Sequence, residues 1–240
     1  FALIIAKRRL GIALGGIFGI TLMLWICIQF YMFPLNFMST AYFIFGALQA
    51  VTGYAAAVFY KQENFCVSKS DYPDIGTNGE RLVVFFSRMG YVKNLAFEEA
   101  NRTGADIYEI RSTERTAGTL GFWWCGRYGM HRWDMPIEPV TVDLAAYKHI
   151  TICSPIWVFE LSPPVRAFCR QTAGKIKSVD CILVHYQKRD YKNAAREIES
   201  ILGVKCKSIR SVLCRTGKYK TVYEYSDSGK VLPQKVGSEL

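Results

Sequence analysis

The first sixty residues of this 240-residue chain contain no aspartate or glutamate. Their only charges are Lys7, Arg8 and Arg9, so the runs 10–33 and 40–60 are free of charge. A soluble core helix of this length would carry a polar stripe, and neither run has one. A signal peptide would have a shorter apolar core and no second apolar run behind it. We therefore predict a transmembrane helical hairpin in residues 1–60, with two membrane-spanning helices in those two runs.

Small residues recur along both predicted spans, and small residues let two helix backbones approach closely in lipid. They are Gly11, Gly15 and Gly19 in the first span and Gly46 and Gly53 in the second. We expect the spans to pack on each other, with a partner protein as the alternative. Basic residues flank the pair and none lies between the spans. The positive-inside rule therefore predicts a multi-pass protein of the cell membrane whose remaining residues lie in the cytoplasm.

Metal-binding patterns are also missing. The eight cysteines include no C-x-x-C pair and have no histidine at zinc-ligand spacing, and scattered thiols agree with a reducing compartment. No Ser-His-Asp arrangement or pair of carboxylates indicates a catalytic site. We likewise expect no nucleic-acid partner, because no recognised binding motif accompanies the net charge of +10.

The basic surplus is concentrated at the end of the chain. Residues 61–174 hold 13 basic and 13 acidic side chains, whereas residues 175–240 hold 14 basic and 7 acidic ones. A basic face toward anionic membrane lipid would explain this surplus, and a solvated basic face would explain it equally well.

The remaining residues alternate between short β-rich runs and helical stretches. After a polar linker at 61–80, we predict strands at 81–86, 105–110, 149–153, 179–186 and 206–214, and helices at 92–103, 164–172 and 190–202. This alternation predicts an α/β domain over residues 81–216 with a doubly wound, parallel five-stranded sheet. Residues 217–240 predict a C-terminal β-hairpin and tail, where such a fold would normally end in a helix.

The segment 112–144 interrupts the pattern, because it is too long and too aromatic for a simple crossover helix. Its three tryptophans, Trp123, Trp124 and Trp133, could cover a ligand or contact lipid. The simplest expectation is that they pack this long loop on the sheet.

Three segments resemble the flavodoxin superfamily. R-L-V-V-F-F-S-R-M-G-Y-V-K-N-L-A at 81–96 resembles its first strand and FMN phosphate loop, and T-G-A-D-I-Y-E-I at 103–110 resembles its second strand. I-C-S-P-I-W-V-F-E-L-S-P-P-V-R-A-F at 152–168 is similar to its third strand, flavin-contacting loop and next helix. The resemblance covers about residues 81–213 and implies a flavodoxin-like fold and a noncovalently bound FMN.

Ligands of open α/β sheets bind beyond the carboxyl ends of the strands, so three loops form the predicted FMN site. The candidate residues are Ser87, Arg88, Met89, Gly90, Tyr91, Val92 and Lys93 in the first loop, Ser154, Pro155, Ile156, Trp157 and Val158 in the second, and Tyr186 in the third. Trp157 and Tyr186 would lie against the two faces of the flavin ring.

The first loop departs from the family pattern, because Met89 and Val92 stand where hydroxyl side chains are usual. Each lost hydrogen bond to a charged group costs about 1.5–3 kcal/mol. Backbone N–H groups would remain, and Arg88 and Lys93 could supply charge. Both a weakened FMN site and a site that has lost its ligand are compatible with this loop.

The leading hypothesis is a membrane-anchored, flavodoxin-like protein that binds FMN and transfers electrons at the cytoplasmic face of the membrane. Its expected partners are membrane lipid and a membrane redox protein or quinone. Two alternatives remain: an NAD(P)H-dependent quinone or flavin reductase, and an FMN-free module with an interaction or regulatory role.

Overall fold

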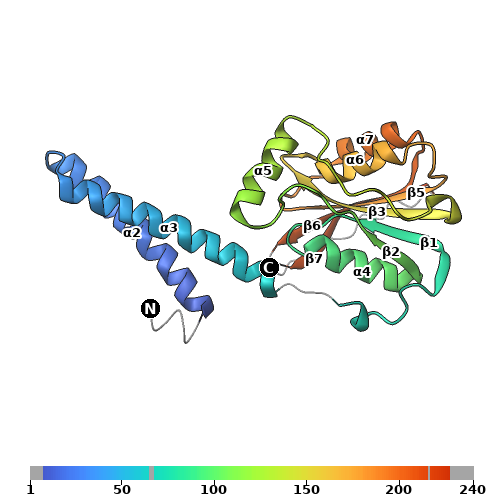
Figure 1. Ribbon diagram of the computed structural model, residues 1–240, viewed down its shortest axis with the longest axis horizontal. Helices are drawn as coiled ribbons and strands as arrows, with labels where there is room; N and C mark the ends of the chain where they lie inside the picture. The colour runs from blue at the N-terminus through green and yellow to red at the C-terminus, as the bar shows by residue number, and fades with distance from the viewer. Residues whose placement is uncertain (1–7, 65–67, 216, 228–240) are drawn as a thin grey trace. The chain divides into compact units, whose positions relative to one another are not determined.

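The computed structural model describes residues 8–64, 68–215 and 217–227, and the chain divides into two compact units, residues 1–65 and 66–240. The first unit consists of two helices, α2 (Arg8–Met32) and α3 (Phe37–Asn64) (Figure 1). Asn36 begins α3 by accepting a hydrogen bond from the Ser39 N–H at 2.9 Å. The turn between the helices is thus capped by a side chain.

Glycines make the contact between α2 and α3. A Cβ atom on Gly53 would lie 2.7 Å from the Cα of Gly16, and one on Gly19 would lie 2.5 Å from the backbone nitrogen of Ala50. Gly15, which the four-residue spacing places on the same stripe, has no heavy atom within 4 Å of its Cβ position. The two antiparallel helices therefore pack directly on each other, and Gly16 rather than Gly15 lies in their interface.

The structure supports the two predicted membrane spans unequally. Among the described residues one helix, Arg9–Met32, is long and apolar enough to cross a membrane. The second run does form the long helix α3, but Ser39, Thr40, Gln49 and Thr52 make it more polar than α2. Of the two predicted membrane-spanning helices, the structure therefore supports one, α2.

A mixed sheet of seven strands forms the second unit, with the order β2-β1-β3-β5-β6-β7 and with β4 paired to β3. The strands are β1 (Asn78–Phe85), β2 (Ala105–Glu109), β3 (His149–Trp157), β4 (Glu160–Leu161), β5 (Val179–His185), β6 (Cys206–Arg215) and β7 (Lys218–Ser226). The first five along the order are parallel, and β7 pairs antiparallel with β6. Renumbered without β4, the parallel strands have the order 2-1-3-4-5 of the flavodoxin-like fold.

Helices cover both faces of this sheet. The helix α4 (Tyr91–Thr103) lies on one face, and α5 (Gly118–Met130), α6 (Pro163–Gln171) and α7 (Lys192–Leu202) lie on the other (Figure 1). Short 3₁₀ turns occur at Lys69–Asp71 and Leu144–Ala146. Alternate residues of the central strands feed two separate apolar cores, with Val83 and Phe85 facing α4 and Leu82 and Val84 facing the opposite layer.

The structure differs from the predicted sheet at its C-terminal edge. The prediction has five parallel strands and a separate hairpin in residues 217–240, but β7 returns along β6 and extends the sheet. Gly217, with a φ of +88°, lies in the tight connection between these two strands. The second strand of the expected hairpin, K-V-L at 230–232, falls in residues 228–240, outside the described part of the chain.

The glycine contact between α2 and α3 is testable. We expect Gly53→Ala to destabilise the helix pair by about 1–3 kcal/mol, because the added methyl group meets the Gly16 backbone. The matched control is Gly15→Ala, which meets no atom and gains up to about 1 kcal/mol of helix propensity. Thermal unfolding of the detergent-purified chain, followed by circular dichroism, measures both. Equal effects of the two substitutions would contradict the helix register described above.

Candidate functional site

The first loop of the candidate site connects β1 to α4. Gly90 caps the helix with a φ of +85°, a left-handed conformation that favours glycine. The first helical hydrogen bond runs from the Asn94 N–H to the Gly90 carbonyl at 2.9 Å, so the preceding N–H groups of the turn have no helical acceptor. No side chain caps this N-terminus. Such a turn is suited to an anion.

Ser87 adds a second indication of a ligand in this loop. Its hydroxyl oxygen is buried, and it has no hydrogen-bond partner among the described residues. A buried polar atom without a partner costs about 1–3 kcal/mol, and native structures contain few of them. An acceptor in this loop, such as a phosphate oxygen, would satisfy the Ser87 hydroxyl.

Four predicted residues of the loop have other contacts. The Arg88 guanidinium donates to the Gly118 carbonyl at 3.3 Å and lies over the Phe122 ring, both on α5. Lys93 Nζ lies over the Phe97 ring, one turn further along α4. Val92 is 4% exposed within the apolar core, so its position calls for an apolar side chain. The Tyr91 carbonyl accepts a hydrogen bond from Tyr219 on β7 at 2.7 Å.

The second loop is a two-residue hairpin turn between β3 and β4. Trp157 pairs with Glu160 across this turn, and both central residues, Val158 and Phe159, have positive φ angles of 49° and 66°. Positive φ at both positions is what a type I′ turn requires, and asparagine or glycine usually occupies them. For a β-branched valine this conformation is strained, by about 1–3 kcal/mol. Backbone strain of this kind is concentrated at functional sites.

Trp157 stands at the start of this turn with its ring half-buried. It packs edge-on against Phe86, with ring centroids 5.4 Å apart and an interplanar angle of 86°. Phe86 directly precedes Ser87, so this aromatic contact joins the first loop to the second. Pro155 and Ile156 are half-buried in β3, while Ser154 is fully buried and its hydroxyl contacts the Ser162 hydroxyl at 3.0 Å.

A buried arginine holds the strained hairpin in place. Arg166 on α6 is 1% exposed and forms a two-pronged ion pair with Glu197 on α7. The same guanidinium donates to the Leu161 carbonyl of β4 at 3.2 Å and to the Trp133 carbonyl at 3.3 Å. Arg132 also pairs with Glu197, at 3.3 Å. One charged group thus fastens the hairpin to α6, α7 and the segment that follows α5.

The third loop follows β5 and rests on His185. The His185 ring is buried, with Nδ1 2.5 Å from the Gln187 carbonyl and Nε2 2.8 Å from the Ser211 hydroxyl. Because a carbonyl can only accept, Nδ1 carries the proton of the neutral ring. Burial lowers the pKa of His185, and the hydrogen bond to Gln187 offsets part of this effect. Tyr186, 70% exposed, stands beside it with the Arg215 guanidinium over its ring at 5.6 Å.

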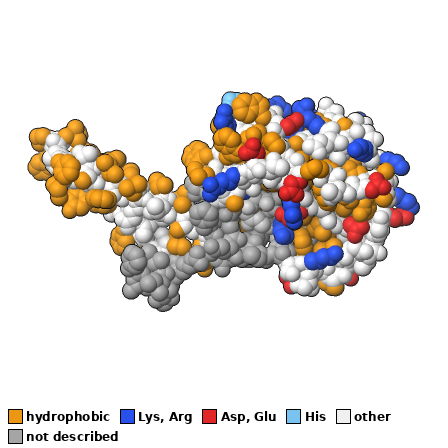
Figure 2. Space-filling view, viewed as in Figure 1, with side chains coloured by type: hydrophobic (Ala, Val, Ile, Leu, Met, Phe, Trp, Pro, Cys, Tyr) orange, Lys and Arg blue, Asp and Glu red, His pale blue; other side chains and the backbone are white. Residues whose placement is uncertain are grey.

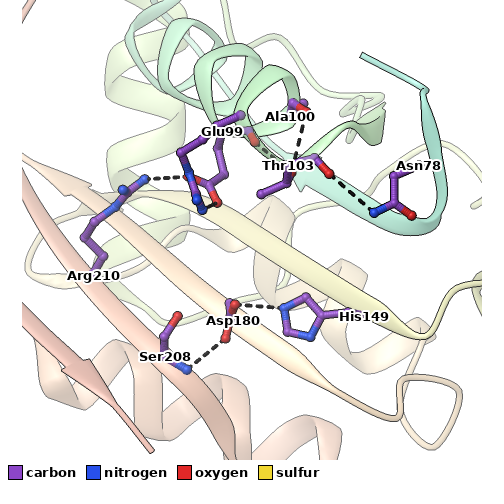
Figure 3. Close-up of polar contacts among 9 residues, drawn as sticks. Asn78, Glu99, Ala100, Thr103, His149, Asp180, Ser208 and Arg210 are labelled. Carbon is purple, nitrogen blue, oxygen red and sulfur yellow. Dashed lines mark hydrogen bonds and ion pairs between the residues drawn. The ribbon is translucent and has the colours of Figure 1, made fainter. Parts of the chain in front are cut away.

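The amino-terminal edge of the sheet carries a second polar cluster that the sequence does not reveal (Figure 3). His149 Nε2 lies 2.8 Å from Asp180 Oδ2, and Asp180 Oδ1 accepts from the Ser208 N–H at 2.8 Å. Burial raises the pKa of Asp180, but the hydrogen bonds from His149 and Ser208 outweigh it, and the pKa is lowered from its ordinary value. Glu99 on α4 pairs with Arg210 on β6 at 3.1 Å. The contacts of His149, Asp180 and Ser208 join β3, β5 and β6 near their amino-terminal ends, whereas Glu99 joins α4 to the middle of β6.

The described part of the chain contains several buried thiols. No group of three or more histidine, cysteine or acidic side chains could hold a metal ion there. Cys153, Cys169 and Cys181 are buried, and burial raises the pKa of the Cys153 and Cys169 thiols.

Comparison with protein-family models and with curated proteins finds no match. Three solved structures are similar to 56% of this chain. A flavoprotein in complex with FMN from Lactobacillus acidophilus NCFM has 17% identity and a TM-score of 0.48 over 93% of its chain. Candidate flavoproteins from Bacteroides eggerthii and Bacteroides uniformis have 18% and 21% identity and TM-scores of 0.48 and 0.47, over 86% and 88% of their chains. These similarities are weak, and the strand order and parallel pairings of this chain define its fold.

Removing the buried arginine should loosen the second loop. We expect Arg166→Met to destabilise the second unit by about 3–5 kcal/mol, because Glu197 keeps its charge in a mostly buried position and two carbonyl groups lose their donor. The matched control is Arg170→Met on the same helix, whose pair with Asp134 is exposed and contributes about 0–1 kcal/mol. Urea denaturation measures the stability, and hydrogen exchange at residues 158–161 measures the hairpin. Equal losses in the two variants would contradict the role assigned to Arg166.

We expect acid to lower the stability of the second unit at a pH that depends on the pKa of His185. Because the folded-state pKa lies below the ordinary value of 6.5, the unfolded chain binds a proton first, and stability is lost as the pH falls below that value. The loss has a limit of about 1.4 kcal/mol per pH unit. His185→Gln should remove this pH dependence, whereas His131→Gln, at an exposed position, should retain it. Denaturant midpoints across this range test the expectation, and an unchanged slope in His185→Gln would refute it.

The contribution of Asp180 to stability is lost only at lower pH, below the ordinary pKa of 3.8 for this carboxyl group.

Proposed function

We propose that this chain is a membrane-anchored, flavodoxin-like protein that binds FMN and transfers electrons beside the membrane. The observation that carries the cofactor assignment is the buried, unpartnered Ser87 hydroxyl in a loop that opens a helix. This loop leaves β1 at the point where the strand order reverses, which is where open α/β sheets bind their ligands. One of the similar solved structures is a flavoprotein in complex with FMN, in agreement with the proposal.

The residues present fit a flavin phosphate at the first loop and a flat ring at the other two. Ser87 and the N–H groups at the start of α4 would hold the phosphate. Trp157, held edge-on by Phe86, and the exposed ring of Tyr186 would contact the flavin ring. The redox chemistry would come from the flavin, while the protein positions the ring and sets its surroundings.

The departures from the flavodoxin loop are less damaging than the sequence indicates. Val92 is part of the apolar core, so a hydroxyl there would be buried among apolar side chains. Met89 alone is then a loop position where a hydroxyl could be restored. Arg88 contacts α5 and Lys93 contacts Phe97, so phosphate binding would depend on Ser87 and backbone N–H groups. We accordingly propose an FMN site of reduced affinity.

Membrane anchoring is proposed from the character of both N-terminal helices. Large apolar side chains are exposed along α2 and also along α3, where Phe45 is 61%, Leu48 57% and Val51 61% exposed (Figure 2). The Thr52 hydroxyl donates to the Leu48 carbonyl of the same helix at 2.8 Å, and the Thr40 hydroxyl donates to the carbonyl of Asn36, just before the helix, at 3.0 Å. Both polar groups are thus satisfied without water. A two-helix anchor, with the second unit in the cytoplasm, would give these apolar faces a lipid environment.

A flavin titration tests the cofactor assignment. We expect the detergent-purified chain to bind added FMN and to quench its fluorescence. Ser87→Ala should weaken binding by roughly ten- to a hundredfold, because a hydrogen bond to a charged group is lost. The matched control, Ser208→Ala, changes a half-buried serine at the opposite edge of the sheet and should leave the affinity unchanged.

Absence of binding in the native chain would refute the FMN assignment. Gain of binding in Met89→Thr would then show that the fold is intact and that the native loop has lost its ligand. That result would favour an FMN-free interaction or regulatory module. Val92→Thr would not serve this purpose, because it places a hydroxyl in the core.

A further inference from the structure

The helix α5 has the reverse of the usual distribution of side chains. Its buried positions are occupied by small residues, Gly118, Gly121, Cys125 and Gly129, at three- and four-residue spacing. A Cβ atom on Gly129 would lie 3.3 Å from Val158 Cγ2 and 3.5 Å from Trp157 Cβ, so the helix backbone lies against the strained hairpin. The small residues therefore face the protein, where large apolar side chains would normally lie.

Large apolar side chains cover the outer side of α5 and its flanks. We define the α5 face as the exposed side chains Leu120, Phe122, Trp123, Trp124, Met130 and Trp133, which are 38% to 69% exposed. Figure 2 shows apolar side chains gathered over this helix, with basic side chains among them. A contiguous apolar face of this kind indicates a binding surface.

Arginines are interleaved with these rings. The Arg127 guanidinium lies over the rings of Trp124 and Trp133, at 5.2 and 5.5 Å, and Arg88 lies over Phe122 at 5.3 Å. Residues 111–133 contain four arginines and one acidic residue, Glu114. Glu114 is itself hydrogen-bonded to the indole nitrogen of Trp124 at 2.9 Å. The face is therefore apolar with a surplus of positive charge at its rim.

We propose that the α5 face docks on the headgroup region of an anionic lipid bilayer. Tryptophan is enriched at this depth of a membrane, and arginine beside it pairs with anionic headgroups. The same chain carries a candidate membrane-spanning helix, which would keep the second unit near lipid. The inference rests on the proposed membrane location, and it adds a second, interfacial contact next to the Val158 hairpin of the candidate flavin site.

Tryptophan quenching by brominated lipids tests the proposal on the full chain reconstituted in nanodiscs. The Trp25→Phe variant reports on the α5 face, because it lacks the tryptophan of α2 and keeps those of the second unit. We expect bromines placed near the headgroups to reduce its emission, and to reduce it more in anionic than in zwitterionic bilayers. Adding Trp123→Phe and Trp124→Phe should abolish most of this quenching. Adding Trp157→Phe instead, at a half-buried position, should preserve it.

A second variant separates the anchor from the docking face. The chain with Trp123→Phe and Trp124→Phe retains Trp25, whose emission deep bromines should reduce if α2 spans the bilayer. The docking proposal alone would be overturned by a combination of two results. Trp25 would be quenched in this variant, while the α5-face tryptophans of the Trp25→Phe chain would escape quenching and stay accessible to acrylamide. Protection of the face from both bromines and acrylamide would also overturn it, because protein would then cover the face. Loss of quenching at Trp25 would refute the anchor itself.

Discussion

The position of β1 between β2 and β3 is the constraint on which the second unit depends. Parallel hydrogen bonding on both sides of β1 forces the chain to leave it in one direction and to cross back over it before β3. The connections on the two sides of this crossing diverge at the carboxyl edge. The turn after β1 and the hairpin after β3 therefore lie beside each other with no helix between them. Any ligand of this fold finds its binding position there because the backbone leaves that position open.

Holding the second loop at this edge requires an interaction stronger than packing. The hairpin turn has two non-glycine residues at positive φ, a conformation that the local sequence does not favour. Arg166 compensates for it by donating to the hairpin strand and to the segment after α5 while Glu197 neutralises its charge. Breaking this pair would leave the mostly buried Glu197 with the exposed Arg132 as its remaining ion-pair partner among the described residues, so the pair favours one arrangement of the hairpin. The buried Arg166–Glu197 pair thus stabilises the hairpin in which Val158 is strained.

The parts of the fold that follow from periodicity could be predicted from the sequence. The five parallel strands and the helices α4, α6 and α7 lie within a few residues of their predicted ranges, because each shows a local apolar pattern. The partner of β7 could not be predicted, since a strand carries no local record of which edge it joins. The Arg166–Glu197 pair and the cluster of His149 with Asp180 were missed for the same reason. Each joins residues about 30 positions apart, and only the folded chain brings them together.

The exposure of the tryptophans in and after α5 also depends on long-range contacts that the sequence does not show. The simplest expectation from the sequence, that Trp123, Trp124 and Trp133 pack the long segment on the sheet, is wrong. The helix that carries Trp123 and Trp124 contacts the protein through small residues, and at Gly129 its backbone lies close to Val158 and Trp157 of the hairpin. Glycine on the inner side of α5 thus permits the close contact between the helix backbone and the hairpin, while tryptophan side chains occupy the outer side. The helix that approaches the hairpin of the candidate flavin site through Gly129 carries exposed aromatic side chains on its outer side, so the hairpin and the α5 face lie next to each other in the fold.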